Sequence, residues 1–179
     1  MKALLVQIKT YENESLENAI KNIFEQKGDE LLIENYDLQN LEEITSKLLA
    51  LSNSFDYMIG IGLAGFFVLA ETNSNAKIVI NPCMTPSDLP GFSAESQTHL
   101  RQLEEKTYIW ADAEMRVATY GIFTKDADAR DKDVFMKVYG RDVAGRNNYC
   151  MDADGVHGVN ESIENAVWYF GCSSRNIIL

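Results

Sequence analysis

The sequence is short of basic residues and of cysteine, and it has no apolar run long enough to cross a membrane. Its 179 residues include 16 Lys and Arg against 27 Asp and Glu, which gives a net charge of −11. A protein that binds nucleic acid or an anionic membrane surface needs the opposite field, so neither partner is expected. Residues 1–6 are too short an apolar run for the core of a signal peptide. The sequence therefore predicts a cytoplasmic protein.

The three cysteines, Cys83, Cys150 and Cys172, are widely spaced and form no C-x-x-C pair. Their odd number argues against a disulfide framework or a zinc cage, and free thiols in a reducing compartment are expected. The run "DADARDKD" at 126–133 resembles a calcium loop, but such a loop needs Asp or Asn at Arg130 and a glycine directly after it. We therefore predict a solvated loop there, and neither a metal nor a cofactor.

Short apolar runs alternate along the whole chain with segments of helical spacing. Strands are predicted at residues 2–8, 31–34, 57–61, 77–81, 118–124 and 149–151. Helices are predicted around 16–27, with Ser15 as N-cap and Gly28 as stop, around 41–51, in part of 89–110, and at 133–139 and 162–170. Strands joined through helices need crossover connections, so the pattern predicts a three-layer α/β/α fold with a mostly parallel, doubly wound sheet.

The length fits one domain over 1–179, with a core of its own. The polar stretch "TPSDLPGFSAESQTH" at 85–99 interrupts the alternation. Because the loops over the carboxyl edge of such a sheet often carry function, we predict a lid or cap segment around 85–115.

The motif "GIGLAG" at 60–65 stands between two apolar runs, in a strand, sharp turn and helix context. Hydrolases present their nucleophile in this context through the pattern G-x-S-x-G, whose third position here is Gly62. An acid follows the predicted fifth strand, at Asp126 or Asp128, and His157 follows the sixth. Nucleophile, acid, histidine is the chain order of an α/β-hydrolase triad. The alignment leaves both aspartates open and favours Asp126.

From about Tyr57 to its C-terminus the chain resembles the small bacterial α/β-hydrolase esterases of the YqiA-like family. The similarity is carried by "GIGLAGFF", by "KIVINPCMTPSDL" with its Asn81-Pro82 pair, by "YGIFTKDAD" and by "YCMDADGVHGVNESIENAV". The resemblance implies an α/β-hydrolase-like fold, a carboxylesterase-type site at Gly62, Asp126 or Asp128 and His157, and a small ester or acyl ligand in the cleft.

Two catalytic parts of that family are absent. Relatives carry serine where this chain has Gly62, and their first strand leads into His-Gly-Phe, which helps to build the oxyanion hole. Here residues 9–14, "KTYENE", hold neither histidine nor glycine. The sharp turn that presents a nucleophile strains the backbone of any residue with a Cβ. Glycine at position 62 removes this strain where no hydroxyl is needed. A catalytically impaired member of the superfamily is therefore expected.

Alternatives remain open. Cys83, directly after Asn81-Pro82, could serve an active esterase or thioesterase with His157 as its base, and Ser87, Ser93 and Ser96 are weaker nucleophile candidates. His157 could equally be a loop histidine bonded to a backbone carbonyl. An open α/β module that binds a nucleotide or flavin could use "GIGLAG" as a phosphate cradle, although no G-K-[ST] follows the turn.

Overall fold

A single parallel sheet forms the middle layer of the protein. The computed structural model describes residues 1–38, 41–71, 75–140 and 145–175, the last four of them by backbone alone. Within these residues six strands pair in the order β2-β1-β3-β4-β5-β6, and every neighbouring pair is parallel. The strands are β1 (Lys2–Ile8), β2 (Glu30–Tyr36), β3 (Tyr57–Ile61), β4 (Ala76–Ile80), β5 (Thr119–Thr124) and β6 (Tyr149–Ala153). The predicted fold class is confirmed.

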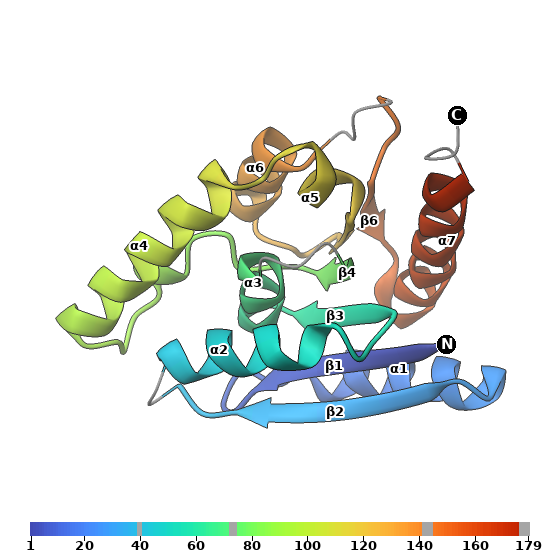
Figure 1. Ribbon diagram of the computed structural model, residues 1–179, viewed down its shortest axis with the longest axis horizontal. Helices are drawn as coiled ribbons and strands as arrows, with labels where there is room; N and C mark the ends of the chain where they lie inside the picture. The colour runs from blue at the N-terminus through green and yellow to red at the C-terminus, as the bar shows by residue number, and fades with distance from the viewer. Residues whose placement is uncertain (39–40, 72–74, 141–144, 176–179) are drawn as a thin grey trace.

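Helices cover both faces of this sheet. Helices α1 (Glu14–Lys27) and α7 (Gly155–Arg175) pack against each other on one face, and the remaining helices lie on the other (Figure 1). These are α2 (Leu41–Ser52), α3 (Leu63–Ala70), the short 3-10 helix η1 (Pro86–Asp88), α4 (Ala94–Ile109), α5 (Ala113–Val117) and α6 (Ala129–Val138). Strand order therefore reverses between β1 and β3, where successive connections leave toward opposite faces.

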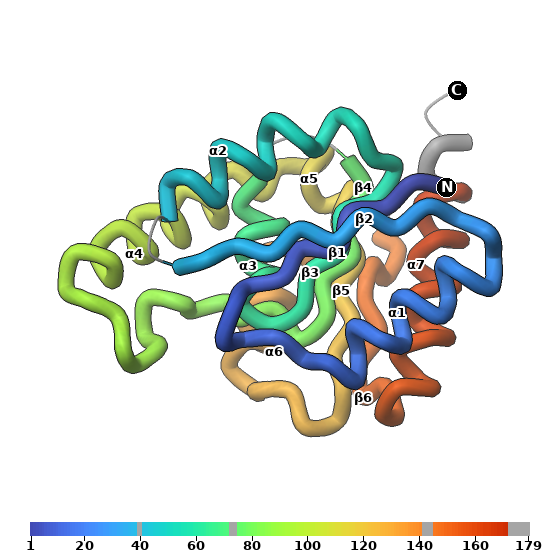
Figure 2. The backbone as a smooth tube through the Cα atoms, turned by 90° about the horizontal axis from the view of Figure 1, so that it is seen from below, coloured from blue at the N-terminus to red at the C-terminus, as the bar shows by residue number. Residues whose placement is uncertain are grey.

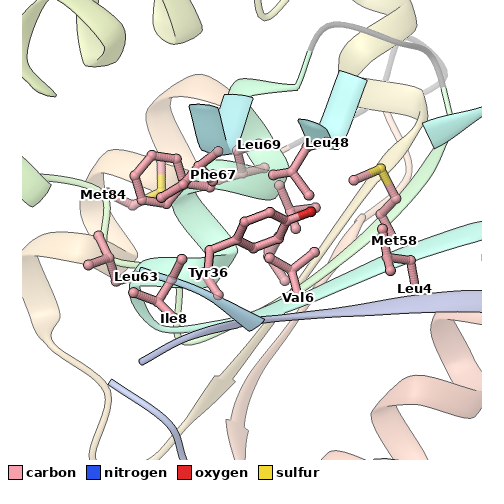
Figure 3. Close-up of a cluster of buried hydrophobic side chains, with 14 of the residues drawn as sticks. Leu4, Val6, Ile8, Tyr36, Leu48, Met58, Leu63, Phe67, Leu69 and Met84 are labelled. Carbon is pink, nitrogen blue, oxygen red and sulfur yellow. The ribbon is translucent and has the colours of Figure 1, made fainter. Parts of the chain in front are cut away.

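Each face of the sheet has its own apolar core. Along β1, Leu4, Val6 and Ile8 point to the cluster under α2 and α3, where Figure 3 shows them beside Leu48 and Phe67. The alternate residues Ala3 and Leu5 belong to the cluster under α1 and α7. A strand buried on both faces needs apolar side chains at successive positions, which explains the uninterrupted apolar run at 3–6 within the strand.

The predicted starts of α1 and α6 are wrong because a capping residue lies further upstream. Helix α1 begins at Glu14 and not after Ser15, since the Asn13 side chain accepts a hydrogen bond from the Leu16 amide at 3.2 Å. Asp128 caps α6, which begins at Ala129, four residues before the predicted start. Helix α7 begins at Gly155, so the segment predicted as a loop before Ser162 is helical. The stop at Gly28 is confirmed by its left-handed φ of 67°.

The predicted lid segment is built of η1, α4 and α5. Helix α4 extends past the carboxyl ends of β1 and β2 in both views (Figures 1 and 2), yet its middle is anchored to the core by the fully buried Leu100. Glu104 accepts a hydrogen bond from the Ser87 amide at 2.7 Å, and the Tyr108 hydroxyl donates to the Met84 carbonyl. Movement of this segment stays a prediction. Across the described residues, no helix combines the length and the apolar character that a membrane span requires.

Candidate functional site

Gly62 alone joins β3 to α3, in a conformation that only glycine adopts readily. Its φ of 56° and ψ of −122° lie in the left-handed half of the φ/ψ map. The turn is held on β4, because the Gly62 amide donates to the Ile80 carbonyl at 2.9 Å and the Gly62 carbonyl accepts from the Cys83 amide at 3.0 Å. A Cβ built at this position meets no atom within 4 Å in the described structure. The turn is therefore strained for a side chain but has space for one.

The other two glycines of the motif are needed for close packing. A Cβ on Gly60 would lie 2.7 Å from the Ala64 carbonyl oxygen and 2.8 Å from the Gly65 Cα. A Cβ on Gly65 would lie 3.1 Å from the Gly60 oxygen and 3.2 Å from the Pro82 Cα. The backbones of β3 and α3 are therefore in direct contact, with no side chain between them. The three glycines of "GIGLAG" divide into two that allow contact and one that allows a left-handed turn.

Left-handed backbone recurs where other strands end. Besides Gly62 after β3, positive φ occurs at Thr10 after β1 (75°), at Asn81 after β4 (45°) and at Asp152 near the end of β6 (58°). Residues with such φ are uncommon outside glycine and gather at functional sites. Because the strands are parallel, all four positions lie at one edge of the sheet, where ligands bind in open α/β folds.

Asn81 also connects the ends of two strands. Its side-chain amide donates to the Thr124 hydroxyl at 2.7 Å, and its side-chain oxygen accepts from the Thr124 amide at 2.9 Å. The Asn81-Pro82 pair singled out in the sequence is therefore a structural link between the end of β4 and the acid loop after β5.

The two candidate acids differ in what their carboxylates do. Asp128 is the N-cap of α6 and accepts from the amides of Arg130 at 2.7 Å and Asp131 at 3.4 Å. Asp126 is exposed, and a hydrogen bond from the Thr124 side chain lowers the pKa of its carboxyl. Of the two carboxylates, that of Asp126 does not cap a helix. Its role as triad acid stays a prediction.

His157 lies in the first turn of α7 and not in the loop where the sequence placed it. Its side chain is 85 % exposed, and Nε2 is 3.3 Å from a carboxylate oxygen of Glu161, one turn further along the same helix. A triad base must instead contact the nucleophile. The catalytic role of His157 stays a prediction that this contact does not support.

Cys83 follows β4, the strand next to the Gly62 turn, but its environment is unfavourable for a nucleophile. Burial, with a smaller contribution from the nearby Asp131 carboxylate, raises the pKa of its thiol to about 12. The reactive form of cysteine is the thiolate, which such surroundings suppress at neutral pH. The lid serines are engaged in local structure: Ser93 caps α4 and donates to the Ser96 hydroxyl at 3.0 Å, and Ser87 is buried.

In the loop after β1, which the sequence predicted to lack an oxyanion donor, two backbone amides form hydrogen bonds to acceptors of the same segment. The Thr10 amide donates to a Glu12 carboxylate oxygen at 3.0 Å, and the Tyr11 amide donates to the Ile8 carbonyl at 3.0 Å. Positioned amides that stabilise an oxyanion have to point at the reacting oxygen. These two are committed to other acceptors.

Asp131 offers a test of the acidic surroundings of Cys83. It accepts from the Met84 amide at 2.7 Å, yet burial raises the pKa of its carboxyl. Its contribution to stability is therefore complete below the unfolded-state pKa and falls as pH rises through the higher folded-state pKa. Asp131→Asn keeps the acceptor and removes the charge, so its stability relative to the parent should improve between pH 4 and pH 7. Urea unfolding at both values measures this, with the exposed Asp133→Asn as control. A relative stability that falls with pH would contradict the assignment.

Pockets lie at both edges of the sheet in the described part of the chain. One is at the carboxyl edge, between the loops after β1 and β2 and the segment that precedes α4; Tyr11, Leu38, Pro90 and Phe92 form its apolar wall. The other lies at the opposite edge of the sheet. Neither includes Gly62, Cys83 or His157. The sequence did not point to the carboxyl-edge pocket, because its walls come from three distant segments.

Comparison with known proteins identifies the fold. No family model and no curated protein matches the chain. A solved structure, the esterase domain of a Rhodothermus marinus protein, superposes with a TM-score of 0.54 at 13 % identity, over 97 % of this chain and 85 % of that one. The protein thus has an α/β-hydrolase-like fold over nearly its whole length. The narrower resemblance to the YqiA-like family gains no support from a family model.

Proposed function

We propose that this protein is a degenerate α/β hydrolase that binds a small ester or acyl compound at the carboxyl edge of its sheet and does not cleave it. The observation that carries the proposal is Gly62. It occupies the single-residue turn between β3 and α3, with a φ of 56° and a ψ of −122°, and contributes no nucleophile. The likeness of the whole fold to an esterase domain supports this interpretation of the turn.

Loss of two catalytic parts makes turnover negligible. Removing the nucleophile of a well-studied serine protease costs roughly a millionfold in kcat. Loss of one oxyanion donor costs about 2.7 to 4 kcal/mol in addition. Here the amides of Thr10 and Tyr11 are bound within their own loop. Restoring either part alone would therefore leave the other deficit in place.

The carboxyl-edge pocket is the proposed place for the apolar part of the ligand. Tyr11, Leu38 and Phe92 offer an apolar surface to an acyl chain or an aromatic leaving group. Such pockets bind small molecules mainly by burying apolar area, and a few polar groups set the orientation. Asp37, Ser93 and Ser96 are polar residues of its lining.

An ester assay tests the absence of catalysis. The purified protein should hydrolyse p-nitrophenyl acetate and butyrate no faster than its His157→Ala variant, because a base without a nucleophile does not form an acyl-enzyme. Initial rates of nitrophenolate release are compared with the buffer rate. Saturable turnover that disappears in Cys83→Ala would overturn the proposal in favour of a cysteine-dependent esterase.

Binding is tested separately with the uncleavable analogue N-(4-nitrophenyl)butanamide. Calorimetry should detect saturable binding to the parent and weaker binding to Phe92→Ser. Trp168→Ser is the matched control, since Trp168 is an exposed aromatic residue on α7, away from the pocket. Equal affinity of both variants would remove the pocket from the proposal.

A further inference from the structure

The second pocket lies between the C-terminal ends of α3 and α4 and the start of α5, all on one side of the sheet (Figure 1). The connections that contribute to it lead into β4 and β5, so it lies at the edge opposite to Gly62. Its apolar surface comes from Leu69, Leu103 and Met115. This pocket is separate from the site of the proposed function.

Trp110 forms one side of this pocket and is 55 % exposed. An indole is costly to leave in water, because most of the stabilisation that Trp provides comes from burying its large ring. The adjoining Ile109 is 79 % exposed. The face of an indole also attracts cations through its quadrupole, and more strongly than other aromatic rings.

The electrostatics of the pocket favour a positive ligand. Asp112 and Glu114 are exposed carboxylates on its margin, against the single ammonium of Lys106, while Glu71 is paired with the buried Lys77 at 3.5 Å. Both α3 and α4 end here, and the C-terminal end of a helix carries partial negative charge. The opposite partial charge at the start of the short α5 is offset by Asp112, which caps that helix by accepting from the Met115 amide at 3.0 Å, so Glu114 is the uncapped carboxylate of the two. The net charge of −11 on the whole protein acts in the same direction.

We propose that this pocket binds a small organic cation whose charge is enclosed in an apolar shell, such as a quaternary ammonium compound. The methyl groups would contact Leu103 and Met115. The charge would lie against the Trp110 ring and near Glu114.

Comparing the affinities of choline and of its neutral isostere 3,3-dimethyl-1-butanol separates the contribution of the charge from that of the ligand's shape. Broadening of the ligand methyl signals in NMR titrations gives the affinity for each. Choline should bind saturably and at least about tenfold more tightly than the alcohol. Trp110→Leu should weaken choline binding about threefold to tenfold, and Glu114→Gln up to about fivefold. In Trp168→Phe, where Trp110 is the remaining tryptophan, choline should still change the indole fluorescence.

Glu105→Gln is the control for charge, because Glu105 is exposed on α4 but outside the pocket. It should bind choline as the parent does. Equal affinity for choline and the alcohol, no saturable binding, or an unchanged affinity in Trp110→Leu would each overturn the proposal. Trp110→Phe, which keeps a ring, provides an intermediate affinity if the leucine variant folds poorly. These measurements do not depend on the ester site.

Discussion

Replacing Gly60 by alanine should destabilise the protein by about 3 kcal/mol or more, because the new Cβ has no room. The atoms it would meet, at 2.7 and 2.8 Å, are backbone atoms of Ala64 and Gly65, which cannot rotate away. The start of α3 would have to move off β3. Fully buried Phe66 and Phe67 on that helix would then lose part of their packing on the sheet.

Gly62→Ala is the matched comparison for this experiment. It meets no described atom within 4 Å, so its cost is confined to the backbone conformation, roughly 1 to 3 kcal/mol. Urea unfolding of the two variants beside the parent measures the difference. If Gly60→Ala is no less stable than Gly62→Ala, the close contact between β3 and α3 is not as the structure has it.

The serine that a hydrolase would carry at position 62 should not restore an enzyme. Gly62→Ser places a Cβ at a φ of 56°, so the variant should lose roughly 1 to 3 kcal/mol of stability, about as much as Gly62→Ala. The new hydroxyl would have space, but hydrogen-bond donors for an oxyanion would be missing. Donors aimed at the oxyanion are often the largest single contribution to acyl transfer, and the Thr10 and Tyr11 amides are engaged elsewhere.

Two measurements separate the halves of this prediction. Thermal denaturation of both position-62 variants tests the strained turn, and an unchanged melting temperature would mean that residue 62 tolerates a side chain freely. p-Nitrophenyl butyrate hydrolysis by Gly62→Ser tests the missing donors. Robust activity in this variant would show that an oxyanion site survives, and that one substitution alone inactivated the protein.

The sequence predicted the fold correctly at positions where the structure accepts few residue types. A run buried on both faces requires the apolar residues at 3–6, and only glycine readily gives the left-handed end of α1 at Gly28. Helix starts were less predictable because several polar residues compete for the cap. At Asn13 two bonds fix the start of α1: its side chain accepts from the Leu16 amide, and its backbone N–H donates to a Glu17 carboxylate oxygen at 3.1 Å.

The candidate site was predicted in part. The glycine turn, its central residue and the strand ends around it followed from the motif and from the parallel order of the strands. The left-handed φ of Thr10 could not be anticipated, because threonine is disfavoured there and gives no signal. The surroundings of Cys83 were equally hidden, since Asp131 comes from a helix that begins almost 50 residues later.

The double hydrogen bond between Asn81 and Thr124 has a mechanical consequence. It continues on one side to the turn, through the Cys83 amide and the Gly62 carbonyl, and on the other to Asp126, which the Thr124 side chain contacts. The glycine turn and the acid loop are thereby joined by short hydrogen-bonded steps between the strand ends. The frame would hold new side chains at 62 and 126 in a constant relative position, so a designer who wants chemistry here has to rebuild the loop at 9–14 and can leave these strand ends as they are.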